Sequence, residues 1–280
     1  MSVSSCAREA IDGAWCVGLP VFAGRSGAPS VTAPDDRMAA ILGRLVSHEV
    51  DGSGTVVLCE LAAEVAGVSG ASIMLLSDEL AQGSLCTTDG VAVYLDDLQF
   101  TLGEGPSLEA HAQGFPVLEP DLAAHASDRW PALVPLAVGA GVRAVFAFPL
   151  RIGAVRLGAV TLFRDVPGPL GDSQYGDALA LALVASRTIL AIQADAPPGS
   201  VAAEIEEGAN FHFVVHQAAG MVSIQLDVGV TEALVRLRAH AFMAGRSIDD
   251  VSRDVVERRL RFDGSAPGGP GASPVTTDDR

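Results

Sequence analysis

Between Ala203 and Phe262, apolar residues recur every three or four positions, which is the period of helices that bury one face. Glycine and N-cap residues interrupt the pattern twice, so this stretch predicts three short helices joined by short turns. Three such helices can bury one small shared core. The predicted inward positions are Phe211, Val215, Ala218, Val222 and Leu226 in the first helix, Leu234, Leu237 and Ala241 in the second, and Ile248, Val251 and Val255 in the third.

The ends of these helices carry their own signals. Gly229 and Gly245 stand where a left-handed residue would end the first and second helices, and Thr231 is a candidate N-cap of the second. Ser247, with Asp250 three positions later, resembles a capping box that begins the third helix. We therefore expect a helical module over residues 201–262.

Residues 36–193 mix the periods of helices and strands. Apolar runs of strand length alternate with helical patterns, and the last two runs are joined by a short turn that predicts an antiparallel hairpin. This order predicts an α+β domain in which helices cover an antiparallel sheet. The expected helices are 36–50, 55–66, 129–138 and 172–193, and the expected strands are 71–77, 84–88, 92–95, 115–118, 143–150 and 155–163.

Three stretches lack either period. Residues 1–35 mix Ser, Gly and Pro without a repeat and predict a flexible N-terminal arm, and residues 263–280 predict a disordered, low-complexity tail. The linker over 194–200 contains two prolines, which forbid a continuous helix, so a signal along it must cross a bend. The expected organisation is arm 1–35, α+β domain 36–193, linker 194–200, three-helix domain 201–262 and tail 263–280.

The three-helix domain carries short motifs on each of its predicted helices. His216–Met221 contains A-x-G, Thr231–Ala241 contains E-A-x-x-x-L-R-x-x-A, and Gly245–Val251 contains R-x-I-x-D-V. Together they resemble the ANTAR domain, a three-helix RNA-binding module of bacterial antitermination regulators. One difference is Ala219, because many family members carry Lys at this position, and its absence removes one phosphate contact.

The resemblance implies that the small residues of the first helix and the arginine of the L-R-x-x-A segment face RNA. Arginine can donate two hydrogen bonds to a phosphate or stack on a loop base, which suits hairpin loops. A solvated charged face is the alternative for the same arginines. The candidate RNA-contacting residues are Ala218, Gly220, Arg236, Arg238, Ala241, Arg246 and Arg253.

The charge of the chain limits how RNA could be bound. A formal net charge of −16 argues against a protein that coats nucleic acid or an anionic membrane, so any contact must be local. All 18 basic residues are arginine, and seven of them lie within residues 201–262 beside nine acids. The RNA expectation therefore rests on the resemblance, and charge alone weighs against it.

The α+β domain has motifs of its own at Leu102–Ala110, Gly114–Val117, Asp128–Pro131 and Gly158–Leu162. In this order they resemble the GAF domain, a small-molecule-sensing fold. The resemblance implies an unidentified small molecule or protein signal, held between the sheet and the segment 102–113. The N-K-x-x-F-D-E signature of many cyclic-nucleotide-binding members is missing, so a cyclic nucleotide is not indicated.

The candidate ligand-pocket residues are Leu102, Gly103, Ser107 and Trp130. Trp130 has packing in the core as its alternative role. The turn at 102–110 lacks the register of a phosphate-binding loop, and Glu104 would repel a phosphate. We therefore expect tight-turn geometry there.

No catalytic motif stands in the sequence, and we expect neither enzyme activity nor a metal or cofactor. His212 and His216 are one helical turn apart, but without a third ligand they are better explained as packing or solvent-facing residues. The cysteines have no C-x-x-C spacing, so they indicate buried thiols of a cytoplasmic protein without a zinc site or a disulfide framework. They are Cys6, Cys16, Cys59 and Cys86.

Two apolar stretches need to be distinguished from membrane spans. Prolines and an arginine interrupt residues 132–150, and residues 178–192 are too short, so both are expected to be core elements. The N-terminus shows no basic region followed by an apolar one, so no signal peptide is expected.

These features predict a cytoplasmic antitermination regulator that senses a signal through the GAF-like domain and binds pairs of RNA hairpins in transcript leaders. The alternative is a ligand-binding or protein-interaction module whose C-terminal bundle dimerises or docks a partner. A homodimer without membrane contact is expected, because residues 172–193 are apolar around more of the helix than one sheet face requires. An N-terminal arm folded over the same helix is the competing explanation.

Overall fold

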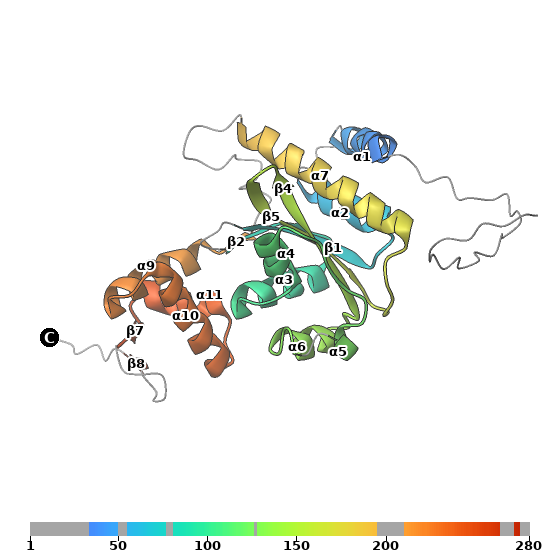
Figure 1. The fold of residues 1–280 in the computed structure, drawn as a ribbon. Coiled ribbons are helices and arrows are strands. Elements are labelled where there is room, and N and C mark those ends of the chain that lie inside the picture. The colour runs from blue at the N-terminus through green and yellow to red at the C-terminus, as the bar shows by residue number, and fades with distance from the viewer. Residues whose placement is uncertain are drawn as a thin grey trace, which may run out of the picture. The chain divides into compact units, whose positions relative to one another are not determined.

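The apolar run expected as a strand at 71–77 forms β1 (Gly70–Leu76), every residue of which is buried. In the computed structural model this strand lies inside a six-stranded antiparallel sheet with the order β3-β4-β5-β1-β2-β6 (Figure 1). The structure describes residues 34–49, 55–76, 81–125, 128–194, 210–263 and 272–274. The other strands of the sheet are β2 (Ala81–Thr87), β3 (Val117–Glu119), β4 (Ala144–Ile152), β5 (Val155–Arg164) and β6 (Asn210–Phe211).

Side chains of β1 alternate between the two faces of the sheet. Ile73 and Leu75 join one apolar cluster, whereas Met74 and Leu76 join another on the opposite face. The predicted β4–β5 hairpin is confirmed, and β5 then pairs with β1. Gly158 permits this pairing, because a Cβ atom there would lie 2.0 Å from the carbonyl oxygen of Met74.

One face of the sheet is covered by α2 (Val56–Ala66) and α7 (Asp172–Ala194), and α1 (Pro34–Glu49) lies against α7 (Figure 1). Arg37 of α1 binds Asp177 of α7, and Ile41 and Leu45 enter the same core as α7. Among the described helices, α7 is long and apolar enough to cross a membrane, and α9 with α10 qualifies only as one bent pair. In this structure α7 packs on α1, α2 and β4, and a helix in the core of a domain can have the same length and apolar composition.

The opposite face carries α3 (Gly90–Leu102) and α4 (Pro106–Gln113), followed in the chain by α5 (Leu122–His125) and α6 (Leu133–Gly139) (Figure 1). The strand expected at 92–95 is therefore wrong. The preceding Thr-Asp-Gly does not form a hairpin turn: Asp89 is an N-cap whose side chain accepts a hydrogen bond from the backbone N–H of Ala92 at 2.8 Å. The α+β architecture with an antiparallel sheet covered by helices is confirmed.

The C-terminal part contains the three expected helices, α9 (Phe213–Leu226), α10 (Val230–Ala244) and α11 (Ile248–Val256). Ser247 caps α11, accepting a hydrogen bond from the backbone N–H of Asp250 at 3.1 Å, and Gly245 ends α10 in the left-handed conformation. Two expected boundaries are wrong. Asp227 rather than Gly229 ends α9, and Gly229 rather than Thr231 is the N-cap of α10.

Two further segments differ from the sequence-based expectations. Phe211 lies in β6 rather than in the first helix of the bundle, because its backbone pairs with Gly83 of β2. In the stretch expected to be disordered, residues 272–274 form the strand β8 (Ala272–Pro274), which pairs with β7 (Leu260–Phe262). Of the expected arm 1–35 and linker 194–200, residues 1–33 and 195–200 lie outside the described residues, whereas residues 34–35 begin α1 and residue 194 ends α7.

Cys59 of α2 and Cys86 of β2 form a disulfide bond inside the core on the α2 side of the sheet. The expectation of four thiols is therefore wrong for this pair. The two cysteines are 27 positions apart and gave no local signal, and only the packing of α2 on β2 brings their side chains together. Cys6 and Cys16 lie outside the described residues.

Candidate functional site

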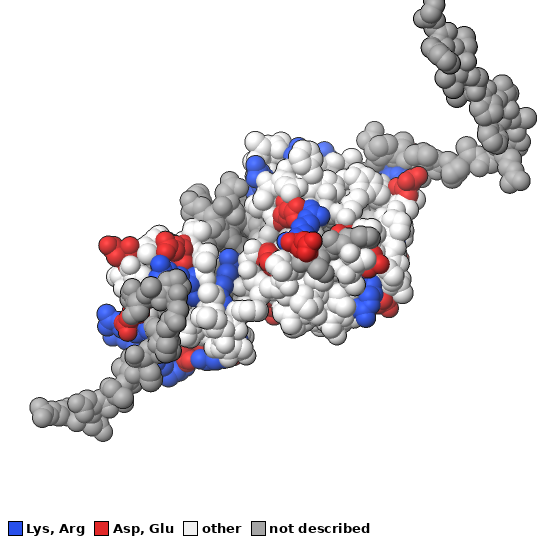
Figure 2. Space-filling model, turned by 60° about the horizontal axis from the view of Figure 1, so that its bottom comes forward, with Lys and Arg blue, Asp and Glu red and all other residues white. Residues whose placement is uncertain are grey.

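Figure 2 shows one face of the protein, on which charged side chains of both signs are scattered. On the face shown in Figure 2, arginines lie beside aspartates and glutamates rather than in one broad basic patch. This distribution agrees with the acidic balance of the chain, whose formal net charge is −16. RNA contact by a few arginines remains compatible with it, whereas a wide electrostatic footprint is not visible on this face.

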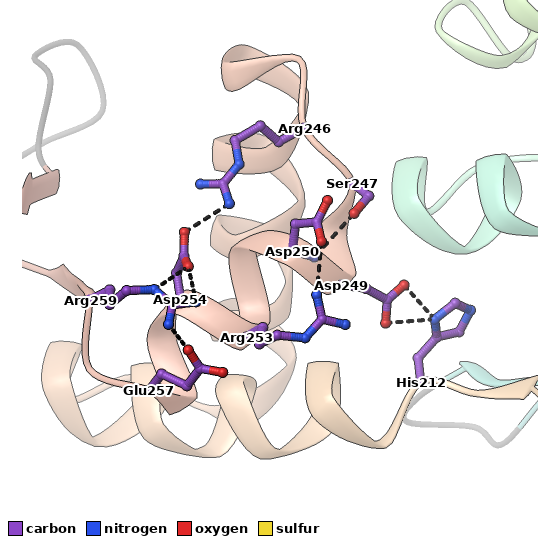
Figure 3. A network of polar contacts seen from close by, with 9 residues as sticks. All are labelled: His212, Arg246, Ser247, Asp249, Asp250, Arg253, Asp254, Glu257 and Arg259. Carbon is purple, nitrogen blue, oxygen red and sulfur yellow. Dashed lines mark hydrogen bonds and ion pairs between the residues drawn. The ribbon is translucent and has the colours of Figure 1, made fainter.

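Three of the candidate arginines form ion pairs within the bundle. Arg236 on α10 binds Glu232 at 2.7 Å, Arg246 in the following turn binds Asp254 at 2.8 Å, and Arg253 on α11 binds Asp250 at 2.9 Å. Figure 3 shows the last two pairs on neighbouring turns of the bundle. All three guanidinium groups are well exposed, so the pairs contribute little to stability and can exchange for another anion.

Asp254 is the acid on which this network converges (Figure 3). Hydrogen bonds from Arg246 and Arg259 hold the pKa of this carboxyl group below its ordinary value. The hydrogen bond within the Ser247 cap, followed by Arg253, likewise lowers the pKa of Asp250. Both groups are therefore anions near neutral pH, and they compete with any phosphate for the same arginines.

The small candidate residues fall into two classes. Ala218 and Ala241 are fully buried in the bundle core, so in this arrangement they pack helices together and do not face solvent. Gly220 is half-buried, and a Cβ atom added to it would meet no described atom within 4 Å. Packing within the described residues therefore does not require glycine at this position.

Arg238 differs from the other candidate arginines, because within the described residues its guanidinium makes no ion pair and its Nε has no hydrogen-bond partner. It lies over the ring of Phe100 on α3, 5.6 Å from the ring centroid. Burial lowers the pKa of Arg238 to about 10 by desolvation. The residue that the ANTAR resemblance places at the RNA face thus contacts the α+β domain in this structure.

His212, at the start of α9, lies beside the same ring and is buried. Its imidazole stacks on Phe100 with 3.9 Å between the ring centroids, and its Nδ1 lies 3.0 Å from Asp249 of α11 (Figure 3). Nε2 lies 3.6 Å from Asp97 of α3. The packing role expected for His212 is therefore observed, and no group of three His, Cys, Asp or Glu among the described residues could hold a metal ion.

The candidate pocket residues lie around the turn between α3 and α4 and at α6. Leu102 is half-buried at the end of α3, and Gly103 ends that helix in the left-handed conformation. Ser107 and Trp130 are buried: the Ser107 hydroxyl bonds to that of Thr161, and Trp130 packs in a core cluster beneath Arg129. Both side chains thus contribute to the packing of this face.

Glu104 in this turn has a structural role. One of its carboxylate oxygens accepts hydrogen bonds from the backbone N–H groups of Ala132 and Leu133, each at 2.8 Å. These groups lie at the start of α6, where helical N–H groups lack partners within the helix. The tight turn expected at 102–110 is therefore observed, and its acid ties two segments together.

Sequence reasoning missed a buried polar group on the α3 side of the sheet. Asp96 accepts hydrogen bonds from Ser72 on β1, at 2.6 Å, and from Ser84 on β2. Desolvation raises its pKa from 3.8 to about 7, against the opposing effect of the two serines. Gln99, one turn further on, accepts from the backbone N–H of Ser107 at 2.8 Å, while its Nε2 has no partner among the described residues. Asp96 and Gln99 are one helical turn apart in a mainly apolar helix, and that spacing was the available signal.

No protein-family model and no curated protein matches the sequence. Among solved structures, the chain is similar to a GAF domain of an Acinetobacter phosphoenolpyruvate-protein phosphotransferase, at 12% identity and a TM-score of 0.42, covering 57% of this chain and 95% of that one. The chain is also similar to a GAF domain region of a protein assigned as a membrane protein from Geobacter sulfurreducens PCA. The identity is 15% and the TM-score 0.42, and the match covers 55% of this chain and 99% of that one. A third similar structure is a domain of a protein assigned as a two-component sensor histidine kinase from Sinorhizobium meliloti 1021. The identity is 19% and the TM-score 0.40, and the match covers 53% of this chain and 94% of that one.

Scores of this size carry no argument about activity, ligand or family. The structure itself shows an antiparallel sheet that includes β1 to β5, with helices over both of its faces. It also shows a bundle of three helices, α9, α10 and α11.

Proposed function

We propose that this protein is a cytoplasmic regulator of transcription termination, with a GAF-like sensor domain and a C-terminal bundle that binds paired RNA hairpins. The main support is that the three ANTAR-like motifs fall on α9, α10 and α11, where Arg236, Arg246 and Arg253 expose their guanidinium groups. Gly220 adds to it, since internal packing leaves space there for a close approach. The proposed role needs no catalytic residue.

RNA binding by the full chain tests this proposal. We expect it to bind an RNA with two hairpins, with an affinity that falls steeply as salt rises, because binding to phosphates releases counterions. Replacing Arg236, Arg246 and Arg253 together by Gln should weaken binding about tenfold or more, and should lower the salt slope by about one for each phosphate that the variant no longer neutralises. Filter binding over a range of salt concentrations measures both quantities.

A matched control removes the same charge from the sensor domain by replacing Arg44, Arg151 and Arg187 with Gln. This variant should bind RNA as the parent does. Equal weakening of both triple variants would mean that only net charge matters. Equal affinity for duplex DNA of the same length, or no affinity for RNA, would contradict the proposal.

We propose that the sensor recognises a small molecule or a protein signal on the α3 side of its sheet. The buried polar side chains of Asp96, Gln99 and Ser107 support this, because a purely structural core would be apolar. Thermal-shift measurements against a panel of metabolites test for such a ligand.

We also propose a homodimer formed across α1 and α7. The fold places α1 against α7, so part of the apolar surplus of α7 is covered within the chain. Leu42 of α1 and Leu179 of α7 nevertheless remain 41% and 42% exposed, and a second copy could cover them. Light scattering should find a dimer at micromolar concentration that becomes a monomer when both leucines are replaced by Arg, and a monomeric parent would contradict it.

The alternative function, docking of a protein partner by the bundle, has one observation in its favour. Val235, Phe242 and Met243 expose apolar side chains along α10. If the chain binds no RNA and associates through this surface, replacing Phe242 and Met243 by Ser should abolish the association. The same substitutions should leave RNA binding unchanged if the first proposal holds.

The disulfide bears on the proposed compartment. Disulfides are rare in reducing compartments, so the Cys59–Cys86 bond argues against a cytoplasmic location unless the protein is oxidised there. Trapping of free thiols by alkylation during cell lysis measures the state of the pair directly. Complete alkylation of both cysteines would agree with the cytoplasmic proposal.

A further inference from the structure

Helix α3 belongs to the sensor domain but also contacts the bundle. Asp96 and Gln99 bind groups of β1, β2 and α4 inside the sensor. Phe100, at the next position, shares a buried apolar cluster with residues of α9, α10 and α11. One rigid helix therefore joins the buried polar group of the sensor to the surface of the bundle.

The Phe100 ring is the centre of this contact. His212 stacks on it, with the two ring planes 15° apart, and the Arg238 guanidinium lies over it. The ring is only 1% exposed. Nε of Arg238 is buried and the residue as a whole is half-buried, so α3 restricts how far the guanidinium can be presented to a nucleic acid.

The end of α3 completes the enclosure of Arg238. Gly103 has a φ of +70°, and a Cβ atom added there would lie 2.9 Å from an Nη atom of Arg238. The guanidinium therefore occupies the space beside a residue that has no side chain. Its partner at this site is an aromatic face rather than an acid, so no ion pair has to break when it leaves.

Two further contacts, both next to the start of α9, hold the bundle against the sensor. His212 links the two parts through Asp97 of α3 and Asp249 of α11. β6, immediately before His212, pairs with β2 at the edge of the sensor sheet. Arg238 is thus held against α3 in a contact that β6 and His212 extend to β2 and to Asp97.

We propose that α3 masks the bundle, with Phe100 and Gly103 holding Arg238 away from RNA until a change at the buried polar side of the same helix releases it. This inference rests on the proposed RNA-binding function and adds how that function is regulated. The signal would pass through the α3–α10 contact, which removes the need to transmit it through a proline-containing linker. RNA and the masking contact would compete for one guanidinium.

The Gly103→Asn variant of the full chain should displace Arg238 from α3 with little change elsewhere. Asn tolerates the left-handed conformation, and its Cβ would displace the flexible end of Arg238. We expect RNA affinity to rise about five- to tenfold, within the usual range of coupling between sites. Gly114→Asn is the matched control, because Gly114 has a φ of +71° and its added Cβ would lie 3.0 Å from Arg151, within the sensor.

A second pair of variants removes the aromatic face. Phe100→Leu should raise RNA affinity as Gly103→Asn does, and adding Arg238→Gln should cancel the gain. Phe146→Leu is the control, because Phe146 is buried in the sensor core with Arg164 lying 5.7 Å from its ring centroid. A gain in both Phe variants would indicate general loosening and would overturn the mask.

Chemical modification reports on the mask without RNA. In the parent, phenylglyoxal should modify Arg238 more slowly than Arg236, and Gly103→Asn should remove the difference, as located by tandem mass spectrometry. If the parent, Gly103→Asn and Phe100→Leu bind RNA with equal affinity, the masking proposal is contradicted while the proposed RNA-binding function stands. Absence of RNA binding in every variant would instead overturn the proposed function.

Discussion

The two faces of the sensor sheet bury different chemistry. The face under α2 and α7 is a mainly apolar core with the Cys59–Cys86 disulfide inside it, where the buried Ser186 bonds only to Ala182 of its own helix. The face under α3 and α4 buries more polar side chains within its apolar surroundings. Its polar members include Ser72, Asp96, Gln99, Ser107 and Thr161.

This difference predicts that the two faces respond differently to their surroundings. Apolar burial stabilises a fold without further conditions, whereas a buried polar group stabilises it only when all its hydrogen bonds are made. Gln99 leaves one donor unpaired among the described residues, and Asp96 is a buried acid. The α3 face is therefore expected to respond to changes in its surroundings, and the α7 face is expected to hold the sheet together while it does.

The largest expected effect comes from Asp96. Its folded-state pKa, about 7, is raised from 3.8, so the folded protein holds this proton more tightly than the unfolded chain does. Its contribution to the free energy of unfolding is complete below about pH 4 and declines by about 1.4 kcal/mol per pH unit up to about pH 7. Urea unfolding at several pH values should show this decline in the parent and a smaller one in Asp96→Asn. Parallel profiles would show that the α3 face carries no buried acid.

A somewhat smaller effect is expected on the apolar face. Replacing Cys59 and Cys86 together by Ala should lower the free energy of unfolding by about 3 kcal/mol, because the unfolded chain is no longer cross-linked over 27 positions. Adding reductant to the parent should give a similar loss. Thiol titration of the unfolded parent should find both cysteines blocked until reductant is added. Equal stability with and without reductant would contradict the cross-link.

The smallest effect concerns the hydroxyl pair between α4 and β5. Ser107→Ala leaves the Thr161 hydroxyl buried without this partner, which should cost about 1–2 kcal/mol of unfolding free energy. The double variant Ser107→Ala with Thr161→Val should recover most of that loss, because neither polar group remains. A double-mutant cycle in urea measures the coupling. Strictly additive losses would mean that the two hydroxyls do not depend on each other.

Local patterns predicted much of the architecture. The β4–β5 hairpin, the long helix α7 and the serine cap of α11 follow from periodicity and end signals within a few residues. The strand predicted at 92–95 is wrong, although it rested on the same kind of local signal as the correct predictions. A Thr-Asp-Gly sequence fits both a hairpin turn and an N-cap, and only Asp89 bonding back to Ala92 decides between them.

The features that matter most to the proposals depend on residues far apart in the sequence. The pairing of Cys59 with Cys86 needs α2 on β2, and the burial of Arg238 needs α3 against α10. The motif that placed Arg238 at an RNA face could not reveal that a sensor helix covers it. Ala218 and Ala241 show the same limit, since small residues fit a close approach to RNA and a tight helix core equally well.

The strand β6 also has a consequence for synthesis of the chain on the ribosome. Ser84 on the edge of β2 pairs with Asn210, which is 126 positions later. At about 5–20 residues per second, roughly 6–25 seconds pass between translation of the two residues. Throughout that interval the backbone groups of β2 form an open edge that another nascent chain could join. The sheet of each molecule is therefore completed only when the segment directly before α9 has been made, and arrested translation within the interval would leave that edge exposed.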